Sequence, residues 1–267
     1  MKKILTCWLL LSCFLQQAGW CQAPVSSYKT SWLRDGAITV AGISAAAVGS
    51  SILTNKEKLT EEDLVGLSKN DVVWFDRFSA GNHSSKAEQV SDVFFYGSFV
   101  TPMLLLFDDK IKQDAPQVYL LYAEAMSIAG GIYSLTAGLT NRKRPNVYAV
   151  DAPLDVRLHK YARNSFYGGH TAATATATFF LAKVFHDFNP GSPAEPFIWA
   201  AAAAVPVTVG YLRMRAGKHF LSDNLVGYAI GASIGILVPE LHKRSSKVSL
   251  TPASTGMYNG MAITYKF

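Results

Sequence analysis

The chain has 267 residues and a formal net charge of +6, from 25 Lys and Arg against 19 Asp and Glu. Hydrophobic residues make up 49% of it and charged residues 16%, whereas a soluble domain usually carries about a quarter charged residues. This composition excludes intrinsic disorder, and it disfavours nucleic-acid binding because no stripe of Lys and Arg is interleaved with stacking aromatics. The apolar excess therefore either fills a large core or faces lipid.

The first 23 residues have the layout of a secretory signal peptide. Lys2 and Lys3 precede an apolar run over residues 4–15, and small and polar residues follow it up to Ala23. This order predicts export with cleavage near Ala23, and an uncleaved membrane anchor is the alternative. The three cysteines all lie at or before Cys21, so a cleaved chain would contain neither a disulfide nor a catalytic thiol.

Six apolar segments after the polar residues 24–35 predict the helices of an all-α bundle. The first is rich in Ala, Gly and Ser, a composition that permits close helix packing. Pro102 is expected to kink the second segment, and Glu124 lies inside the third. The predicted helices cover residues 37–53, 93–107, 117–139, 170–188, 196–212 and 224–241.

Two irregular regions interrupt the series of predicted helices, and a strand-like segment follows the last helix. Residues 55–91 are mixed and charged, with a short helix predicted over residues 61–67. Residues 141–165 are basic and contain two prolines that break regular structure. Alternation over residues 247–254 and 260–267, with a turn over 255–259, predicts a short C-terminal β-hairpin. The terminal Phe also resembles the end of an outer-membrane barrel strand, but one hairpin cannot close a barrel.

Three separated segments, residues 141–145, 165–171 and 213–223, carry groups that suit an oxyanion. Arginine side chains, present in the first and third segments, offer phosphate oxygens a planar fork of donors. At Gly168 and Gly169 a turn leads into a helix, where backbone N–H groups and the helix dipole favour an anion.

Two histidines and one carboxylate in these segments suit acid–base and nucleophilic chemistry. His219 and Asp223 are four residues apart, which places them on one face if that stretch is helical. A carboxylate so placed can hold one ring nitrogen and leave the other free to attack. His170 can then protonate the leaving oxygen. His219 and Asp223 are also plausible metal ligands, but the surrounding arginines favour a bound anion over a cation.

These residues resemble the three signature motifs of the type 2 phosphatidic acid phosphatase (PAP2) superfamily, which includes bacterial acid phosphatases and vanadium haloperoxidases. The family pattern is a Lys, six residues and Arg-Pro; then Pro-Ser-Gly-His; then Ser-Arg, five residues, His, three residues and Asp. The matching residues are Arg144-Pro145 in the first motif, Gly169-His170 in the second, and Arg213, His219 and Asp223 in the third.

The resemblance implies a six-helix PAP2-type bundle and a phosphatase that needs no cofactor and no metal. His219 would attack phosphorus to form a phosphohistidine, with Asp223 supporting it and His170 serving the leaving group. Arg144 and Arg213 would hold the phosphoryl oxygens, helped by the backbone at Gly168 and Gly169. The expected division of the chain is a signal peptide (1–23), an N-terminal helix and linker region (24–91), a PAP2-like domain (92–242) and a C-terminal tail (243–267).

The sequence departs from the family pattern at four positions, which are Ala137 for the lysine, Tyr167 for the proline, and Gly168 and Leu212 for the two serines. One cation and one hydroxyl donor are therefore missing, and losing one oxyanion donor costs about 10²–10³ in turnover. We hypothesise that Lys143 or Arg142 supplies the charge and that the Gly168 N–H replaces the hydroxyl. Unchanged phosphatase kinetics after separate substitution of Arg142 and Lys143 would reject the first half of this hypothesis. The remaining histidines, His83, His159, His186 and His242, are expected at the surface or an interface.

Several of the apolar segments are near the lower limit of membrane-spanning length, about 17 residues. Six spans would match the lipid-phosphatase branch of the family. Cleavage of the signal peptide would leave the new N-terminus outside the cytoplasm, and three membrane spans would then place the loops of Arg144 and His170 in the cytoplasm. A periplasmic site therefore requires either one helix that does not span the membrane or a domain that is wholly exported. We expect a bacterial envelope protein, integral or closely associated with the membrane, whose site faces the periplasm.

The leading functional prediction is hydrolysis of a phosphomonoester or pyrophosphate on a lipid, such as phosphatidic acid, an isoprenyl pyrophosphate or lipid A. Membrane lipid is the expected partner. A soluble periplasmic acid phosphatase acting on small phosphates is the first alternative. A catalytically weakened phosphate-binding relative, motivated by Ala137 and Gly168, is the second. A vanadium haloperoxidase is a further enzyme alternative, although its vanadate site would also need the missing lysine.

Overall fold

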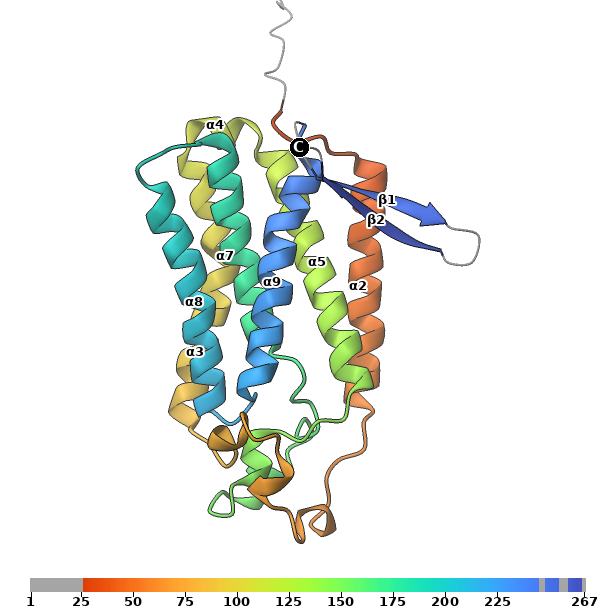
Figure 1. The fold of residues 1–267 in the computed structure, drawn as a ribbon, viewed down its shortest axis with the longest axis vertical. Helices are drawn as coiled ribbons and strands as arrows, with labels where there is room; N and C mark the ends of the chain where they lie inside the picture. The colour runs from red at the N-terminus through yellow and green to blue at the C-terminus, as the bar shows by residue number, and fades with distance from the viewer. Residues whose placement is uncertain (1–25, 245–247, 255–258, 266–267) are drawn as a thin grey trace, which may run out of the picture.

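The computed structural model describes residues 26–244, 248–254 and 259–265, so the predicted signal peptide lies outside the described residues. Within them, six long helices run side by side along the axis of the molecule (Figure 1). Loops and short helices cover the lower end of this bundle in that view, and we call this the site end. The opposite end, where α2 begins and α9 finishes, is the far end. The predicted all-α bundle is confirmed.

The long helices lie where the six apolar segments predict them. They are α2 (Trp32–Thr54), α3 (Ser85–Val100), α5 (Ala115–Leu139), α7 (Gly169–Phe188), α8 (Glu195–Arg215) and α9 (Leu221–His242). The shorter elements are α4 (Asp109–Gln113) and α6 (Leu154–Arg157), with the 3-10 helices η1 (Glu62–Leu64), η2 (Lys69–Asp71), η3 (Arg77–Ser79), η4 (Thr101–Phe107) and η5 (Pro145–Tyr148). The helix predicted over residues 61–67 is thus only the 3-10 turn η1.

Two helices begin earlier than their apolar segments because a serine caps each of them. The Ser31 hydroxyl accepts a hydrogen bond from the first turn of α2, which therefore starts inside the stretch expected to be polar coil. Ser84 caps α3 in the same way, so α3 begins at Ser85 rather than at residue 93. Pro102 does not kink an α-helix as expected, since the chain changes there into the 3-10 helix η4.

The small residues of α2 allow its backbone to touch that of α5. A Cβ atom on Gly49 would lie 2.3 Å from the carbonyl carbon of Ser134, and one on Gly131 would lie 2.8 Å from the carbonyl oxygen of Gly42. No side chain fits in that space, so glycine is required where the helices cross. The predicted close packing at this small-residue face is confirmed.

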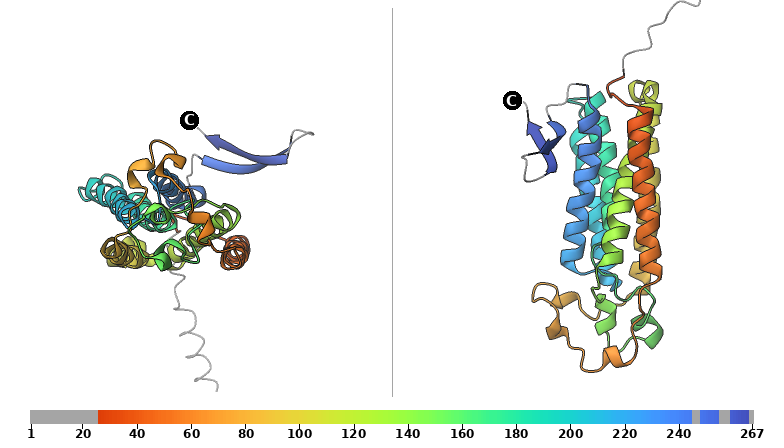
Figure 2. Two further views of the ribbon diagram at one scale, coloured as in Figure 1. Left: turned by 90° about the horizontal axis from the view of Figure 1, so that it is seen from below. Right: turned by 90° about the vertical axis from the view of Figure 1, so that its right-hand side faces the viewer.

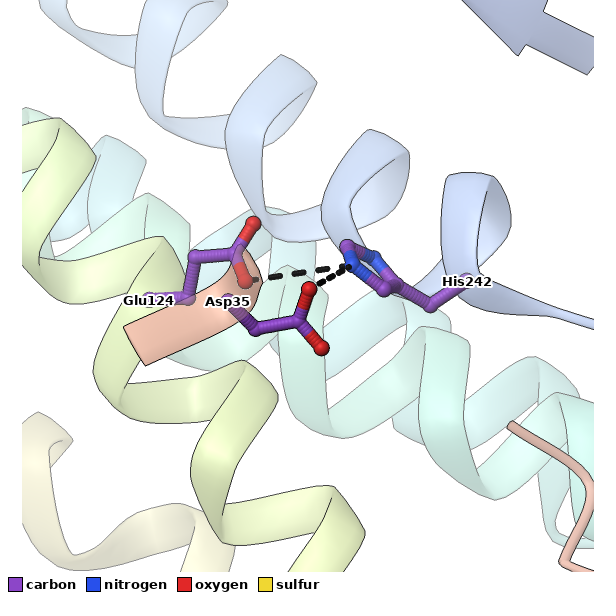
Figure 3. Close-up of side chains that lie close together, drawn as sticks. All are labelled: Asp35, Glu124 and His242. Atoms are coloured by element: carbon purple, nitrogen blue, oxygen red, sulfur yellow. Dashed lines mark hydrogen bonds and ion pairs between the residues drawn. The ribbon is translucent and has the colours of Figure 1, made fainter. Parts of the chain in front are cut away.

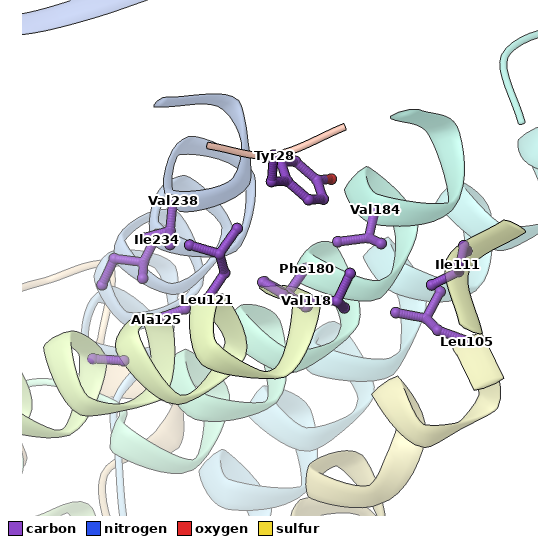
Figure 4. Close-up of a cluster of buried hydrophobic side chains, with 11 residues drawn as sticks. Tyr28, Leu105, Ile111, Val118, Leu121, Ala125, Phe180, Val184, Ile234 and Val238 are labelled. Atoms are coloured by element: carbon purple, nitrogen blue, oxygen red, sulfur yellow. The ribbon is translucent and has the colours of Figure 1, made fainter. Parts of the chain in front are cut away.

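The largest apolar core lies toward the far end of the bundle (Figure 4). Its side chains come from α5, α7 and α9, and η4, α4 and the N-terminal segment close it. Its buried members are Tyr28, Leu105, Ile111, Val118, Leu121, Ala125, Ala129, Phe180, Val184, Ile234 and Val238. This core holds α5, α7 and α9 together.

Five segments are long and apolar enough to cross a membrane: α2, α3 with η4, α5, α8 and α9. In α2 only Asp35 and Gly49 are buried, while apolar side chains such as Leu33 and Val40 are exposed. An exposed apolar surface of this length needs lipid around it. The sixth helix, α7, is packed against α3, α5, α8 and α9. The apolar excess of the composition thus faces lipid, and the chain is an integral membrane protein.

After α9, strands β1 (Val248–Ser254) and β2 (Asn259–Tyr265) pair antiparallel, with Val248 opposite Tyr265. The pair stands beside the bundle (Figure 2). Residues 255–258, which would contain most of the predicted turn, lie outside the described residues, so the hairpin connection stays a prediction.

His242 does not lie at the surface, although a position at the surface or an interface was expected. His242, in the last turn of α9, is 7% exposed because the first turn of α2 and the middle of α5 cover it. His159 is exposed, and His83 and His186 are partly exposed, as expected.

Candidate active site

The three segments that carry the predicted site residues converge at the site end. The last turn of α8 and the first turns of α7 and α9 lie together there, beside the loop that follows α5 (Figure 1). The positive charges of Arg144 and Arg213 both act on His219 and on Lys218, which places the two arginines around the α8–α9 turn. Groups that are up to 75 residues apart in the chain thus form one cluster.

His219 is 1% exposed and is held in one tautomer. Its Nδ1 lies 2.6 Å from the carbonyl oxygen of Ser165, which can only accept, so Nδ1 carries the proton and Nε2 keeps its lone pair. Burial, and then the charges of Arg144 and Arg213, lower the pKa of His219 well below its usual value. The imidazole is therefore neutral at pH 7, with one nitrogen free for nucleophilic attack.

Asp223 does not hold His219 directly, contrary to the prediction from their i, i+4 spacing. Helix α9 begins at Leu221, so His219 lies outside the helix and the two residues do not share a helical face. Asp223 instead caps α9, because its Oδ2 accepts the Phe220 N–H at 2.9 Å. Within the described residues, no ion pair joins His219 and Asp223.

Ser165 links the two residues and was missed by the sequence analysis. Its hydroxyl donates to Asp223 Oδ2 at 2.6 Å, while its carbonyl oxygen accepts from His219. Asp223 therefore acts on His219 through Ser165, which is a positioning residue. Ser165 opens the second predicted segment, but no spacing rule distinguishes it from an ordinary loop serine.

Arg144 is a buried cation, at 8% exposure, without an ion-pair partner among the described residues. Its Nε donates to the carbonyl oxygen of Asn164 at 3.3 Å. Burial lowers the pKa of Arg144 to about 10, so its guanidinium is still charged at pH 7. It lines a pocket of about 150 Å³ together with Tyr133, Tyr161 and other residues. An uncompensated buried charge of this kind is a site for an anion.

Arg213 is also buried, and only part of its guanidinium is occupied. One terminal nitrogen donates to Asp92 at 3.0 Å and to the Ser91 hydroxyl at 3.2 Å. Its Nε is buried and has no hydrogen-bond partner in the described part of the chain. An unused N–H of this kind is available to a phosphoryl oxygen.

His170 stands at the start of α7, where the first N–H groups of the helix have no intrahelical acceptor. Its Nε2 lies 3.2 Å from Asp92, and its ring stacks on Phe95 with centroids 4.0 Å apart. A Cβ on the preceding Gly169 would lie 2.4 Å from the ring of Tyr133, so this glycine lets α7 start against α5. The Gly168 N–H does not replace the missing hydroxyl, because it already donates to the Asp223 carbonyl at 2.9 Å.

The structure does not support Arg142 or Lys143 as the substitute for the family lysine. Arg142 forms ion pairs with Asp223 and, at 2.7 Å, with Asp76, so two carboxylates already neutralise it. The Lys143 ammonium points to the carbonyl oxygen of Asp63 at 3.3 Å. Arg142 orders the network behind His219, and Lys143 lies outside the cluster.

Lys218 is a cation of the cluster that the sequence analysis missed. Its side chain is 14% exposed, and its ammonium pairs with Glu88 of α3 at 2.8 Å. Burial, and then the charges of Arg144 and Arg213, lower the pKa of Lys218, while Glu88 raises it. Its place directly before His219 in the third motif is the signal that could have identified it.

An apolar pocket of about 350 Å³ lies between α8 and α9, next to the start of α7. Thr171, the residue after His170, and Asn224, the residue after Asp223, form its edge. The rest of its lining comes from Pro206, Val207, Gly210, Tyr211, Met214, Leu221, Leu225 and Tyr228. Arg144, His170, Arg213 and His219 do not line this pocket themselves.

Comparison with known proteins gives one family and one solved structure. The family model of the PAP2 superfamily matches residues 118–247, which include all three predicted segments. The transmembrane PAP2 type phosphatidylglycerolphosphate phosphatase from Bacillus subtilis is similar at 20% sequence identity and a TM-score of 0.37, over 78% of this chain and 91% of that chain. No curated protein matches the chain.

Proposed function

Because residues 118–247 match the family model of the PAP2 superfamily, we propose that the protein hydrolyses phosphomonoesters through a phosphohistidine at His219. One observation carries the proposal: the buried guanidinium of Arg144, unpaired among the described residues, lies near a buried and neutral imidazole. A bound phosphate would compensate the buried charge of Arg144, which is otherwise unfavourable. The imidazole of His219 would then be the nucleophile next to that phosphate. The cations that this chemistry needs come from the protein, so no metal ion is required.

The reaction has two steps. The Nε2 lone pair of His219 attacks phosphorus, the bond from phosphorus to the leaving oxygen breaks, and protonated His170 gives its proton to that oxygen. A water molecule, deprotonated by His170, then attacks the phosphohistidine, which releases phosphate and neutral His219. Arg144 and Arg213 bind the equatorial oxygens in both transition states. Burial, and then the charges of Arg213 and Arg144, lower the pKa of His170 to about 2 in the phosphate-free protein. The negative charge of the arriving phosphate opposes these cations and favours the protonated form of His170.

Lys218 supplies the charge that Ala137 lacks, in place of Arg142 or Lys143, because it pairs with one partly exposed carboxylate, Glu88, whereas Arg142 pairs with two buried ones. Lys218→Met keeps the length of the side chain and removes its charge, so we expect kcat/KM for a phosphate ester to fall by about 10²-fold, the typical cost of one oxyanion contact. Lys143→Met is the matched control and should stay within about twofold, because the Lys143 ammonium donates to the carbonyl oxygen of Asp63 outside the cluster. Steady-state kinetics on purified variants measure both, and equal effects at the two positions would remove Lys218 from the site.

The proposed substrate class is a phosphate or pyrophosphate carried by a lipid. The apolar pocket beside the cluster and the lipid-facing helices support this class over small phosphates. Purified protein in detergent, assayed for phosphate release from phosphatidic acid, an isoprenyl pyrophosphate and p-nitrophenyl phosphate, should prefer the lipids. A preference for the soluble ester would favour the acid phosphatase alternative, and no release from any of them would contradict the function.

The site and residues 26–29 lie at opposite ends of the bundle, so they face opposite sides of the membrane if all six helices cross it. Cleavage near Ala23 would leave residues 26–29 in the periplasm and the site in the cytoplasm, so it is incompatible with a periplasmic site. We propose the periplasmic site, with the far end in the cytoplasm. The positive loops do not support this orientation, because Lys and Arg are more numerous at the site end than at the far end, and arginines there are needed for phosphate. A reporter phosphatase fused after Leu139 should then be active, and an inactive fusion would place the site in the cytoplasm.

A further inference from the structure

Three buried ionisable side chains meet at the far end, away from the phosphate cluster (Figure 3). Asp35 comes from the first turn of α2, Glu124 from α5 and His242 from the last turn of α9, and they are 0%, 3% and 7% exposed. One potential ligand atom from each lies within 4.8 Å of the other two. The proposed phosphatase reaction uses none of them.

The orientation of His242 leaves its outer nitrogen facing the two carboxylates. Its Nδ1 lies 2.8 Å from the carbonyl oxygen of Val238 and must carry a proton, because that oxygen can only accept. Its Nε2 lies 3.4 Å from Asp35 Oδ1 and 3.8 Å from Glu124 Oε2. A ring nitrogen fixed in this way by a backbone carbonyl is typical of histidine that binds a metal through the other nitrogen.

The Glu124 carboxylate is available to a cation at this cluster. Its Oε2 is buried and has no hydrogen-bond partner among the described residues, and it points toward His242 (Figure 3). Asp35 is better satisfied, because it accepts from the Ser31 N–H and from Arg34 Nε, both at 2.6 Å. These contacts orient the Asp35 carboxylate and still leave it lone pairs for a further ligand.

We propose that Asp35, Glu124 and His242 bind one divalent transition-metal ion, with Zn²⁺ as the first candidate. One imidazole and two carboxylates are a ligand set that suits Zn²⁺ and its neighbours. With metal–ligand bonds of about 2.1 Å, two ligands of a tetrahedral site are about 3.4 Å apart. The separations of 3.4 and 3.8 Å around Nε2 are close to that value. Such an ion would tie α2, α5 and α9 together at the far end.

The test measures bound metal rather than phosphatase activity. Tag-free full-length protein in detergent, loaded with Zn²⁺ and then dialysed, should hold about one equivalent by mass spectrometry of the metal. Glu124→Gln and His242→Ala should each lose most of it, and Zn²⁺ should raise the unfolding temperature of the wild type alone. His186→Ala, which removes a partly exposed histidine paired with Glu195, is the matched control and should bind as the wild type does.

Glu124→Gln keeps the shape of the side chain, so its loss of metal cannot be attributed to a cavity. Phosphatase activity, which depends on the other end of the bundle, reports whether each variant is folded. Wild-type protein that retains no Zn²⁺ after dialysis would overturn the proposal and leave the cluster held by a shared proton. Equal retention by the wild type and both cluster variants would overturn it as well, since the metal would then be bound elsewhere.

Discussion

Arg144→Ala should lower kcat/KM for a phosphate ester by about 10²–10³-fold while leaving the thermal stability of the phosphate-free protein unchanged or higher. The kinetic loss follows because the buried guanidinium is the cation without a carboxylate partner in the described residues, and one such donor contributes about that factor to the transition state. Stability does not fall because the alanine also removes an uncompensated buried charge. Steady-state kinetics and thermal unfolding of the same preparation measure the two effects.

Phosphate binding separates this prediction from a general defect in folding. Inorganic phosphate should raise the unfolding temperature of the wild type by mass action, and this increase should be absent in Arg144→Ala. Arg163→Ala is the matched control, because Arg163 is a partly buried arginine of the same loop whose charge is paired with Asp63 at 3.2 Å. Normal turnover in Arg144→Ala, or an equal loss in Arg163→Ala, would show that Arg144 is not the phosphate ligand.

The helices could be predicted because their signals are local. Apolar stretches of 15 or more residues between polar and proline-containing regions place all six, and the errors at their starts come from the caps at Ser31 and Ser84. Whether the apolar surface faces a protein core or lipid could be decided only from the structure. An apolar helix may face a protein core or lipid, and only the exposed side chains of α2 decide between them.

The meeting of the three segments at one end of the bundle could be predicted, but the contacts among their side chains could not. The motif spacing brings Arg144, His170, Arg213 and His219 to one end of the bundle. The hydrogen-bond partner of His219 depends on where helix α9 starts. Because α9 starts at Leu221, Asp223 caps the helix, and the Ser165 carbonyl oxygen accepts the hydrogen bond from His219. Helix boundaries are the least certain feature of a sequence-based prediction.

Charges near the site were misassigned for a similar reason. Arg142 follows the same apolar helix as Arg144, but two buried carboxylates from distant segments take up its charge. Lys218 was overlooked because its partner, Glu88, is 130 residues away in the chain. His242 was expected at the surface or an interface, but residues of α2 and α5, which are distant from it in the chain, cover it. Only tertiary contacts reveal these pairings.

His219→Ala should abolish turnover, with a loss of about 10⁴-fold or more, because the variant has no nucleophile. His219→Gln keeps more of the buried volume and should lose as much activity. Rapid quenching with a ³²P-labelled ester should trap an acid-labile, base-stable phosphoprotein in the wild type and none in either variant. His159→Ala, at an exposed histidine in the loop before α7, is the control and should behave as the wild type does.

His170→Ala distinguishes a phosphohistidine from direct attack by water. With a good leaving group such as p-nitrophenolate, the first step needs little help from an acid, whereas the second step still needs a base for water. The phosphoprotein should therefore accumulate in His170→Ala, with a burst of p-nitrophenolate followed by slow turnover. If His219 only positioned a water molecule, no phosphoprotein would form in any variant and no burst would appear. If His219→Ala kept the turnover of the wild type, His219 would be excluded as the nucleophile. The arginines would then only bind phosphate.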